Sequence, residues 1–532
     1  MRLAPLLAII ALPCALVAQA TQQSQSKPAP APEGFGDAFK ARPYGKGSIK
    51  VGNEKGTVIV VGGGGMGPEV YKAFIDAAGG PDAIILDVPN ASEQDTGQMN
   101  TANTGASWRN NGAKNVVVLY TRDRKVADSD TFTAIIKKAG GVWFEGGRQY
   151  HLVQDYGGTK TEKEIMALVD RGGVVGGSSA GASILGDFMV RGAPSSNNFI
   201  MDYPGYERGF GYLKNVGIDQ HVVARSRLPD LADSIVPRYK DLLGISEDEG
   251  TVWVVKGDTA TIIGRNKAFA YNAKDKNDDG YPFITLHPGD KFNLNTRKVI
   301  SRAIDRSPVK EDFIKSMFSK YNDANAGGAT VLVAQNGEVF IDHAFGVAQQ
   351  PKYMPKTTLP QFDVGDISKT FTELCAQLPP PQRGRGNATP DSNAAPAAGR
   401  GRGRGGPPPS PLQQCVTRVS TTIGAHQTAA TDSTHIQSSV DELYRFALGL
   451  DQAAFRGTPN APVTVDLTKG WAVDTYKGAT RVAAYVTPDG KKGAFVRLPD
   501  KHVAVIILTN DANADAKGMA EKILDQVLAN QK

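Results

Sequence analysis

Short apolar stretches rich in β-branched residues alternate with helical patterns from residue 44 to residue 305. The apolar residues of the expected strands are continuous and do not alternate with polar ones, and these strands are Thr57–Val61, Ala83–Asp87, Asn115–Tyr120, Gly141–Phe144 and Gly173–Val175. The expected helices between them are Pro68–Ala77, Thr131–Lys138 and Lys160–Asp170. Continuous apolar strands that alternate with helices are typical of a parallel sheet covered on both faces. The pattern predicts a doubly wound α/β domain over residues 44–305, with strands at 252–255, 259–263 and 268–272 forming hairpins.

A second unit is expected over residues 330–532, after a helical connector at residues 306–329. It opens with strand-like residues 329–334 and 337–340, a pattern that predicts a hairpin. A segment rich in Pro, Gly, Arg and Ala interrupts this unit at residues 378–412. Because such a composition cannot bury a core, we expect this insert to be disordered.

The chain has 532 residues and a formal net charge of +6. Most of that excess positive charge lies at residues 383–404, which contain five arginines and one aspartate. The rest of the chain is nearly neutral, so its charge does not favour a nucleic acid or a membrane surface as partner. Three cysteines are too few for a disulfide-rich scaffold or a four-cysteine metal site.

The N-terminus carries the pattern of an export signal. Met1 and Arg2 precede a short apolar run, and Ala18-Gln19-Ala20 fits a cleavage site. We therefore expect a signal peptide at residues 1–20, a flexible lead-in at residues 21–43, and a periplasmic or secreted protein that is free of the membrane after cleavage.

Export leaves two cysteines, Cys375 and Cys415, one on each side of the insert, because Cys14 is removed with the signal. In an oxidising compartment these two thiols can form a disulfide that closes off the insert. Two free or buried thiols are the alternative, and the sequence leaves both open.

The strongest chemical signal is the segment Gly177-Ser178-Ser179-Ala180-Gly181, between a predicted strand and a helical pattern. Its small residues allow the strained turn of a nucleophile elbow, which lifts the Ser179 hydroxyl clear of the sheet. The backbone N–H of Ala180, at the start of the helix, can then hold an oxyanion. An ordinary Gly/Ser turn is the alternative.

A serine nucleophile needs a base, and His221 is the best candidate. It follows Asp219 and Gln220 at the end of a strand-like run and precedes Arg225 and Arg227. Polar and charged neighbours of this kind suit a pocket that binds charged or amide-bearing substrates. A histidine buried in the core is the alternative.

The base in turn needs a carboxylate that orients it. Glu249, just before a predicted strand, is our choice, while Glu247, Asp248 and Asp219 are rivals that the sequence does not eliminate. The chain order of serine, histidine and acid differs from the order in α/β-hydrolases, so we do not expect that fold.

The segment Phe144–Gln149 ends another predicted strand with a glycine pair. The backbone N–H of Gly147 can reach the same oxyanion, and the Gln149 side chain can donate a hydrogen bond to substrate. A plain loop with two glycines is the alternative.

Two further motifs point to other chemistry. Gly62–Gly67 fits G-x-G-x-x-G after the first strand, and Asp87 lies where a ribose-binding acid is expected, so an NAD-binding oxidoreductase is the runner-up. Asp275–Gly280 resembles the start of a calcium loop, but its twelfth position is Leu286 instead of glutamate, which favours a hairpin turn.

Four segments together resemble the cyanophycinase branch of the S51 serine peptidases, in order and spacing over residues 44–305. They are Phe144–Gln149, Gly177–Ala182, Asp219–His221 with Arg225 and Arg227, and Asp248–Thr251. The resemblance implies a class I glutamine-amidotransferase-like, flavodoxin-like fold in which Ser179 is the nucleophile, His221 the base and Glu249 the third member. The substrate pocket that it implies is lined by Gln149, Asp219, Gln220, Arg225 and Arg227.

Cyanophycinases hydrolyse multi-L-arginyl-poly-L-aspartate to β-aspartyl-arginine dipeptides, and dipeptidases of the same family cut after an N-terminal aspartate. The chain departs from the cyanophycinase pattern at Val222, where an aromatic residue is usual, and at Asp230, where a basic residue is usual. Residues 244–249 also carry extra positions before the acid.

The second unit resembles the β-lactamase-like, penicillin-binding type of serine hydrolase in scattered segments, at residues 362–371, 439–446, 470–471 and 505–510. Asp366 stands where that type has its nucleophilic serine, three positions before Lys369. We therefore expect a smaller, truncated α+β domain without catalysis, whose role is docking, dimerisation, polymer binding or structure alone.

The sequence thus predicts an exported serine exopeptidase that hydrolyses aspartyl peptide or isopeptide bonds, with cyanophycin as the preferred substrate. Neither a metal nor an organic cofactor is expected. The expected partner is a peptide or cyanophycin-like polymer, and a homodimer is left open. A non-catalytic binding protein on the same fold is the alternative from another class.

Overall fold

The computed structural model describes most of the chain from residue 50 onwards. The described residues are 50–93, 104–194, 199–275, 282–323, 326–346, 361–379, 409–432, 435–452, 455, 457–458, 461–486, 492–511 and 513–530. The predicted signal peptide, the lead-in and residues 380–408 of the predicted insert lie outside them. Within these ranges, no helix is both long enough and apolar enough to cross a membrane.

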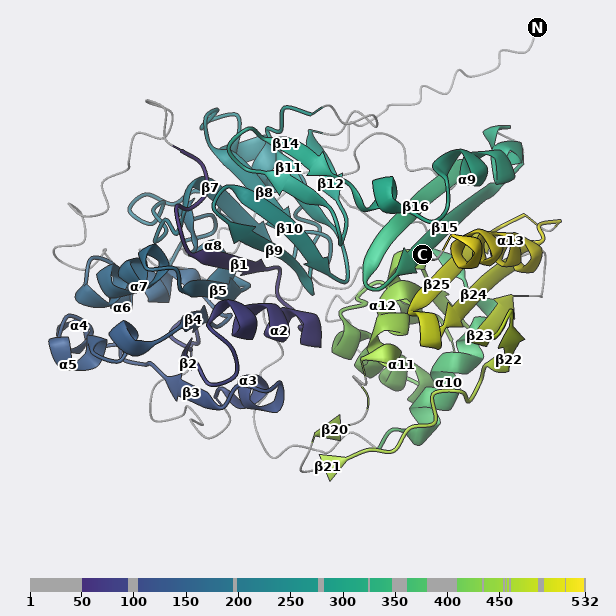
Figure 1. Cartoon of the computed structure of the whole chain (residues 1–532), viewed down its shortest axis with the longest axis horizontal. Coiled ribbons are helices and arrows are strands. Elements are labelled where there is room, and N and C mark those ends of the chain that lie inside the picture. Colours follow the sequence, from purple (N-terminus) through teal and green to yellow (C-terminus); the bar gives the residue numbers. More distant parts are fainter. Residues whose placement is uncertain are drawn as a thin grey trace, which may run out of the picture.

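The first unit is built around a nine-stranded sheet in the order β14-β13-β10-β9-β1-β5-β4-β2-β3 (Figure 1). Strands β1, β5, β4, β2 and β3 are parallel, and β9 continues the sheet antiparallel to β1. The bounds are β1 Thr57–Val61, β2 Ile84–Val88, β3 Asn115–Val118, β4 Gly141–Phe144, β5 Val174–Ser178, β9 Thr251–Lys256, β10 Thr259–Gly264, β13 Lys291–Asn293 and β14 Lys298–Ser301. The mixed α/β class with a large parallel part is confirmed, and its flavodoxin-like classification stays a prediction.

Helices cover both faces of the parallel part. They are α2 Pro68–Ala77, α3 Ala106–Asn110, α4 Arg124–Ala127, α5 Asp130–Thr133, α6 Gln149–Tyr156, α7 Lys160–Asp170 and α8 Ala180–Ser183. Val58 and Val60 of β1 belong to the core that includes residues of α6 and α7, whereas Ile59 and Val61 belong to the core of α2 and α3. Burial on both faces explains why β1 is apolar at four consecutive positions, Val58–Val61. The helix expected over 131–138 is instead α5 followed by a short 3-10 turn.

A second sheet of five strands, in the order β12-β11-β8-β7-β6, was not expected from the sequence. Its strands are β6 Gly186–Phe188, β7 Leu213–Gln220, β8 Leu243–Glu247, β11 Ala268–Tyr271 and β12 Phe283–Leu286. The predicted hairpin of β9 and β10 is present, but β11 pairs with β8 and β12 in this second sheet. The calcium-like segment lies between the antiparallel strands β11 and β12, although residues 276–281 are outside the described part.

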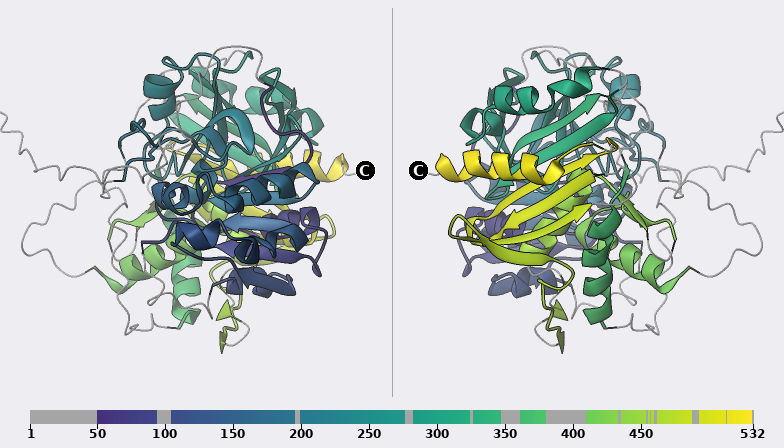
Figure 2. Two further views of the ribbon diagram at one scale, coloured as in Figure 1. Left: turned by 90° about the vertical axis from the view of Figure 1, so that its left-hand side faces the viewer. Right: turned by 90° about the vertical axis from the view of Figure 1, so that its right-hand side faces the viewer.

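The second unit is a six-stranded antiparallel sheet between two helical layers, in the order β16-β15-β25-β24-β23-β22. One face packs against α9 and α13, and the other packs against α10, α11 and α12. Figure 2 shows α13 lying across this sheet. The bounds are α9 Glu311–Met317, β15 Gly328–Gln335, β16 Glu338–Gly346, α10 Ser368–Gln377, α11 Pro411–Ile423, α12 Val440–Asp451, β22 Ala472–Tyr476, β23 Ala479–Val486, β24 Lys492–Leu498, β25 Val503–Thr509 and α13 Ala516–Ala529.

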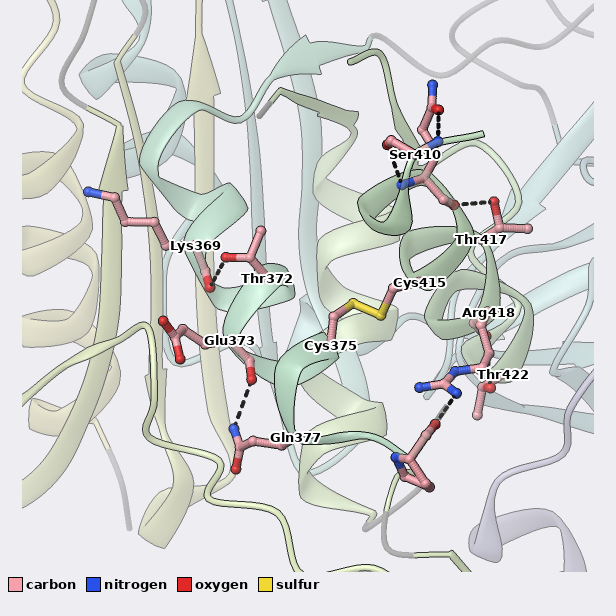
Figure 3. The surroundings of a disulfide bond; sticks show 12 residues. Lys369, Thr372, Glu373, Cys375, Gln377, Ser410, Cys415, Thr417, Arg418 and Thr422 are labelled. Carbon is pink, nitrogen blue, oxygen red and sulfur yellow. Dashed lines mark hydrogen bonds between the residues drawn. A yellow bond between two sulfur atoms is a disulfide. The ribbon is translucent and has the colours of Figure 1, made fainter. Parts of the chain in front are cut away.

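A disulfide joins α10 to α11 through Cys375 and Cys415 (Figure 3). Helix α11 begins within the end of the predicted insert, so residues 411 and 412 are helical and not part of a disordered segment. The reason is local, because Ser410 and Gln413 form a capping box and Pro411 occupies the first turn.

Candidate active site

Ser179 lies in a tight turn between β5 and α8. Its backbone has φ 57° and ψ −115°, a conformation that a non-glycine residue rarely adopts. A Cβ on Gly177 would lie 2.2 Å from the carbonyl oxygen of Gly181, and a Cβ on Gly181 would lie 2.0 Å from that of Phe144. The two glycines therefore let strand, turn and helix approach closely enough to present Ser179 at the carboxyl end of the sheet.

His221 follows the last residue of β7 and lies against Ser179. Its Nε2 is 2.8 Å from the Ser179 Oγ, and its backbone N–H donates to the carbonyl of Gly62 at 3.0 Å. The residue has φ 55° and is 4% exposed. Burial lowers the pKa of His221 below its usual value, although the hydrogen bond to Glu249 acts in the opposite direction. The ring is thus neutral near pH 7 and able to accept a proton at Nε2.

Glu249, in the connection between β8 and β9, contacts the other side of the same ring. Its Oε1 is 2.5 Å from the His221 Nδ1. Burial alone would raise the pKa of Glu249, but hydrogen bonds from His221 and His426 hold it well below its usual range. The carboxylate is therefore charged and fixes the imidazole with Nδ1 as donor and Nε2 facing the serine.

The rival acids have other contacts. Asp248 accepts hydrogen bonds from the backbone N–H groups of Val223 and Ala224 at 3.1 and 2.8 Å. Asp219 is bound by Arg191, and burial raises the pKa of Glu247 well above its usual value. Of the four acids that the sequence left open, Glu249 is the one in hydrogen-bond contact with His221.

The glycine run after β1 surrounds these side chains. A Cβ on Gly63 would lie 2.0 Å from Cε1 of His221, and a Cβ on Gly64 would lie 2.6 Å from Oε2 of Glu249. Close packing against His221 and Glu249 therefore explains why these positions are glycine, without a bound dinucleotide. Asp87, the expected ribose ligand, is fully buried, and burial raises its pKa to about 9. Because the Asp87 carboxyl is not presented to an incoming ribose, the structure gives the NAD interpretation no support.

Of the predicted oxyanion donors, Ala180 adjoins Ser179 in the chain, and Gly147 follows Gly146, which borders the serine. Ala180 is the first residue of α8, so its N–H lies at the positive end of that helix. In the glycine pair, a Cβ on Gly146 would lie 3.3 Å from the Cβ of Ser179, so this backbone borders the serine directly. Gly147 follows with φ 141°, and a Cβ there would meet the carbonyl oxygen of Ala91 at 2.1 Å.

The predicted substrate residues have several separate polar contacts, and Gln220 and Arg227 contact each other close to His221 in the chain. Gln149 donates through Nε2 to the carbonyl of Val190 at 2.8 Å. Gln220 accepts from Arg227 at 3.2 Å, and its own Nε2 lies 3.4 Å from the Ser183 hydroxyl. Burial lowers the pKa of Arg227 to about 9. Arg225 is only partly buried, and its backbone N–H donates to the His221 carbonyl at 2.8 Å.

Arg191, which was not predicted from the sequence, binds Asp219, one of the predicted substrate residues. It donates two hydrogen bonds of 2.8 Å to Asp219 and one of 2.5 Å to Asp230. Its side chain is 1% exposed, so both ion pairs of the guanidinium are shielded from solvent. Asp230, one of the departures from the cyanophycinase pattern, thus takes part in an ion pair. No local pattern in the sequence marks Arg191, which follows a mixed segment at residues 184–190 that itself contains Asp187.

The second unit also reaches the site, which the sequence analysis did not predict. His426, in the loop after α11, is hydrogen-bonded through Nε2 to Oε2 of Glu249. Arg445 of α12 donates to Oδ2 of Asp248 at 2.8 Å. Around these contacts, Gln452 bonds to Arg265 at 2.5 Å and to Glu69 at 2.7 Å.

The family model described as peptidase family S51 matches residues 58–263. A cyanophycinase of Synechococcus elongatus is 27% identical over 281 residues, which cover 49% of this chain and 86% of that protein. A cyanophycinase of Geminocystis herdmanii is 28% identical over 270 residues, covering 47% of this chain and 98% of that protein. Among solved structures, a peptidase from an acI-B1 Actinobacterium aligns at 23% identity over 46% of this chain and 98% of that chain, with a TM-score of 0.37. The range matched by the family model contains Ser179, His221 and Glu249.

Proposed function

Because the peptidase family S51 model matches residues 58–263, we propose that the chain is an exported serine exopeptidase that hydrolyses aspartyl peptide or isopeptide bonds. The proposed substrate is cyanophycin, and the proposed products are β-aspartyl-arginine dipeptides. The observation that carries the proposal is the unbroken hydrogen-bonded chain from the Ser179 hydroxyl through His221 to Glu249.

The proposed reaction begins when the Ser179 Oγ attacks the carbonyl carbon of the scissile bond while His221 Nε2 takes the hydroxyl proton. Backbone N–H groups of Ala180 and Gly147 hold the oxyanion that forms. His221 then gives its proton to the leaving amine, and the carbon–nitrogen bond breaks. A water molecule, deprotonated by the same ring, hydrolyses the acyl-enzyme and restores Ser179. Throughout, Glu249 stabilises the imidazolium without taking a proton.

The chemistry of the substrate fits the charges beside the serine. In the proposed substrate each aspartyl residue carries an arginine joined through its amino group, so the carboxylate of that arginine is free, and a guanidinium forms two-pronged hydrogen bonds with a carboxylate. Arg225 is more exposed than Arg227, so we assign the substrate carboxylate to Arg225. In this assignment Arg227 does not bind the substrate carboxylate but donates a hydrogen bond to the Gln220 side chain and so orients it.

Export is part of this proposal. The disulfide between Cys375 and Cys415 supports it, because such bonds persist in oxidising compartments such as the bacterial periplasm. The signal pattern at residues 1–20 points the same way.

The test uses purified full-length protein with cyanophycin, β-aspartyl-arginine, and α-aspartyl dipeptides as separate substrates. We expect release of dipeptides from cyanophycin, and we expect Ser179→Ala to reduce kcat by at least about 10⁴-fold, the scale on which loss of a serine nucleophile acts. Ser178→Ala removes the neighbouring hydroxyl and is the matched control. Cleavage of α-aspartyl dipeptides alone would replace the substrate proposal. Equal activity of Ser179→Ala and the native protein would overturn the serine mechanism.

A further inference from the structure

Glu249 is held by two histidines from two different units of the chain. Its Oε1 contacts His221 Nδ1 at 2.5 Å, and its Oε2 contacts Nε2 of His426. His426 lies 177 positions further along the chain, in a loop that follows α11 of the second unit. The second unit has its own hydrophobic cores, so this contact crosses from one unit into the active site of the other.

Glycines in both units allow the second unit to approach the Glu249 carboxylate closely. A Cβ on Gly65 would lie 3.0 Å from the carbonyl oxygen of Thr422, near the end of α11. A Cβ on Gly424 would lie 3.9 Å from the Cβ of Glu249. Small residues on both sides therefore allow the end of α11 to rest on the glycine run that borders the active site.

One buried guanidinium ties the two loops together. Arg445 is 1% exposed, and it donates through Nη2 to Oδ2 of Asp248 at 2.8 Å. Its Nη1 donates to the carbonyl of Gly424, two residues before His426. Arg445 thus fixes the loop that carries His426 relative to the loop that carries Glu249.

We propose that His426 is a positioning residue of the active site, supplied by the second unit, which locks the outer oxygen of Glu249 so that the inner oxygen stays aligned with His221. The final torsion of a glutamate side chain is broad, so a carboxylate held at one oxygen can rotate out of alignment. A second hydrogen bond at the other oxygen removes that freedom. This inference rests on the proposed function, because it assigns a role within that reaction.

The charge of His426 adds a second effect. The groups that face it are Glu249 and Asp248 from the first unit, and Arg445 and Glu442 from α12. Burial lowers its pKa, but the hydrogen bond to Glu249 and the charge of that carboxylate outweigh burial and raise the pKa above its usual value. Glu249 stabilises the protonated form of His221 by its negative charge. A protonated His426 on the other side of Glu249 offsets part of that charge, and it therefore lowers the pKa of His221.

The experiment compares His426→Ala and His426→Gln with two reference variants of the full-length protein, in the cyanophycin assay. His435→Ala is the matched control, because His435 belongs to the same unit, is 54% exposed, and pairs with Asp432. Ser179→Ala reports whether the serine chemistry itself holds. Melting temperatures establish that each variant is folded.

We expect His426→Ala to lower kcat by about 10- to 100-fold, the range seen when a partner that orients a site residue is lost. KM should change little, since His426 contacts Glu249 and not the proposed substrate residues. His426→Gln should recover most of kcat, because its amide N–H can donate to the same oxygen. Neither variant carries the charge, so the acid limb of kcat/KM should move to higher pH in both.

The outcomes separate this inference from the function on which it rests. If Ser179→Ala is inactive while His426→Ala keeps the native kcat and pH profile, the role of His426 is overturned and the peptidase stands. If His426→Gln is folded but recovers no more activity than His426→Ala, positioning through this hydrogen bond is overturned as well. If Ser179→Ala is fully active, the proposed function and the role of His426 fall together.

Discussion

Two carboxyl side chains lie next to each other at the carboxyl ends of β2 and β4, behind the serine loop. Burial is the main reason that the pKa of Asp87 is raised to about 9, and the neighbouring Glu145 raises it further. Burial also raises the pKa of Glu145. A pair of this kind holds at least one proton at neutral pH. The pair affects how stability depends on pH.

The effect has a definite sign. Asp87 has an ordinary pKa of 3.8 when exposed, and about 9 in the fold. Between these values the unfolded chain has lost a proton that the folded chain keeps, so stability falls as pH rises through this window. Asn cannot titrate, so Asp87→Asn should remove that loss. We expect its melting temperature to exceed that of the native protein by at least about 2–4 °C at pH 8, the shift per kcal/mol for a unit of this size, and by less at pH 5.

Thermal unfolding followed by circular dichroism at both pH values checks this. Asp82→Asn is the control, because Asp82 is exposed and pairs with Lys114 only at the surface. A difference between Asp87→Asn and the native protein that is the same at pH 5 and pH 8 would contradict a raised pKa.

Some residues of the candidate site could be predicted from the sequence, and others could not. Ser179, His221 and Glu249 stand out because a strained turn, a base and an acid each need particular neighbours in the chain, and the structure brings the three side chains into contact. Arg191 and His426 have no such local signature. Their contacts depend on how β7 and α11 are placed in space, which residue patterns alone do not specify.

The loop between β1 and α2 shows how one element supports another. Gly63 has φ 95°, and a Cβ there would overlap the ring of His221. We expect Gly63→Ala to displace that ring and to lower kcat by about 10²-fold, which is the cost of a misplacement of about 1 Å. Steady-state kinetics on cyanophycin measures the loss.

Gly80→Ala is a close control for this change. Gly80 has φ 99°, so alanine meets the same backbone strain there, but its Cβ would have nothing within 4 Å. This variant should lose about 1 kcal/mol of stability and keep its kcat. If both variants lose only stability, the contact between Gly63 and His221 has no bearing on the activity.

Strands were predictable where they are buried on both faces, as in β1, and less so where pairing is long-range. Strand β11 was expected as part of a hairpin, yet it pairs with β8, more than twenty residues earlier in the chain. An apolar run predicts a strand but not its neighbours, so the second sheet could not be assigned. That sheet carries β7, which delivers His221 to the serine.

At the scale of the whole molecule, the two units meet through buried charged groups as well as through the active site. Lys267 of the first unit lies 2.6 Å from Asp342 and 3.1 Å from Asp441 of the second. Together with Arg445 and Asp248, these pairs place opposite charges on facing surfaces, and leaving one partner unpaired would be costly. The arrangement of the two units is thus specified by several contacts, of which His426 with Glu249 is the one at the site.

The disulfide sets the stability of the part of the second unit that makes this contact. It ties α11, whose far end precedes His426, to α10 across a separation of 40 residues. Closing a loop of that length restricts the unfolded chain by about 4 kcal/mol in the chain-entropy treatment. We expect the double variant Cys375→Ser with Cys415→Ser to lose stability on that scale in urea unfolding. Dithiothreitol should lower the native protein to the same midpoint and leave the double variant unchanged, because only the native protein has the bond to lose. A native midpoint that does not respond to the reductant, together with a double variant of equal stability, would show that α11 is held by packing alone.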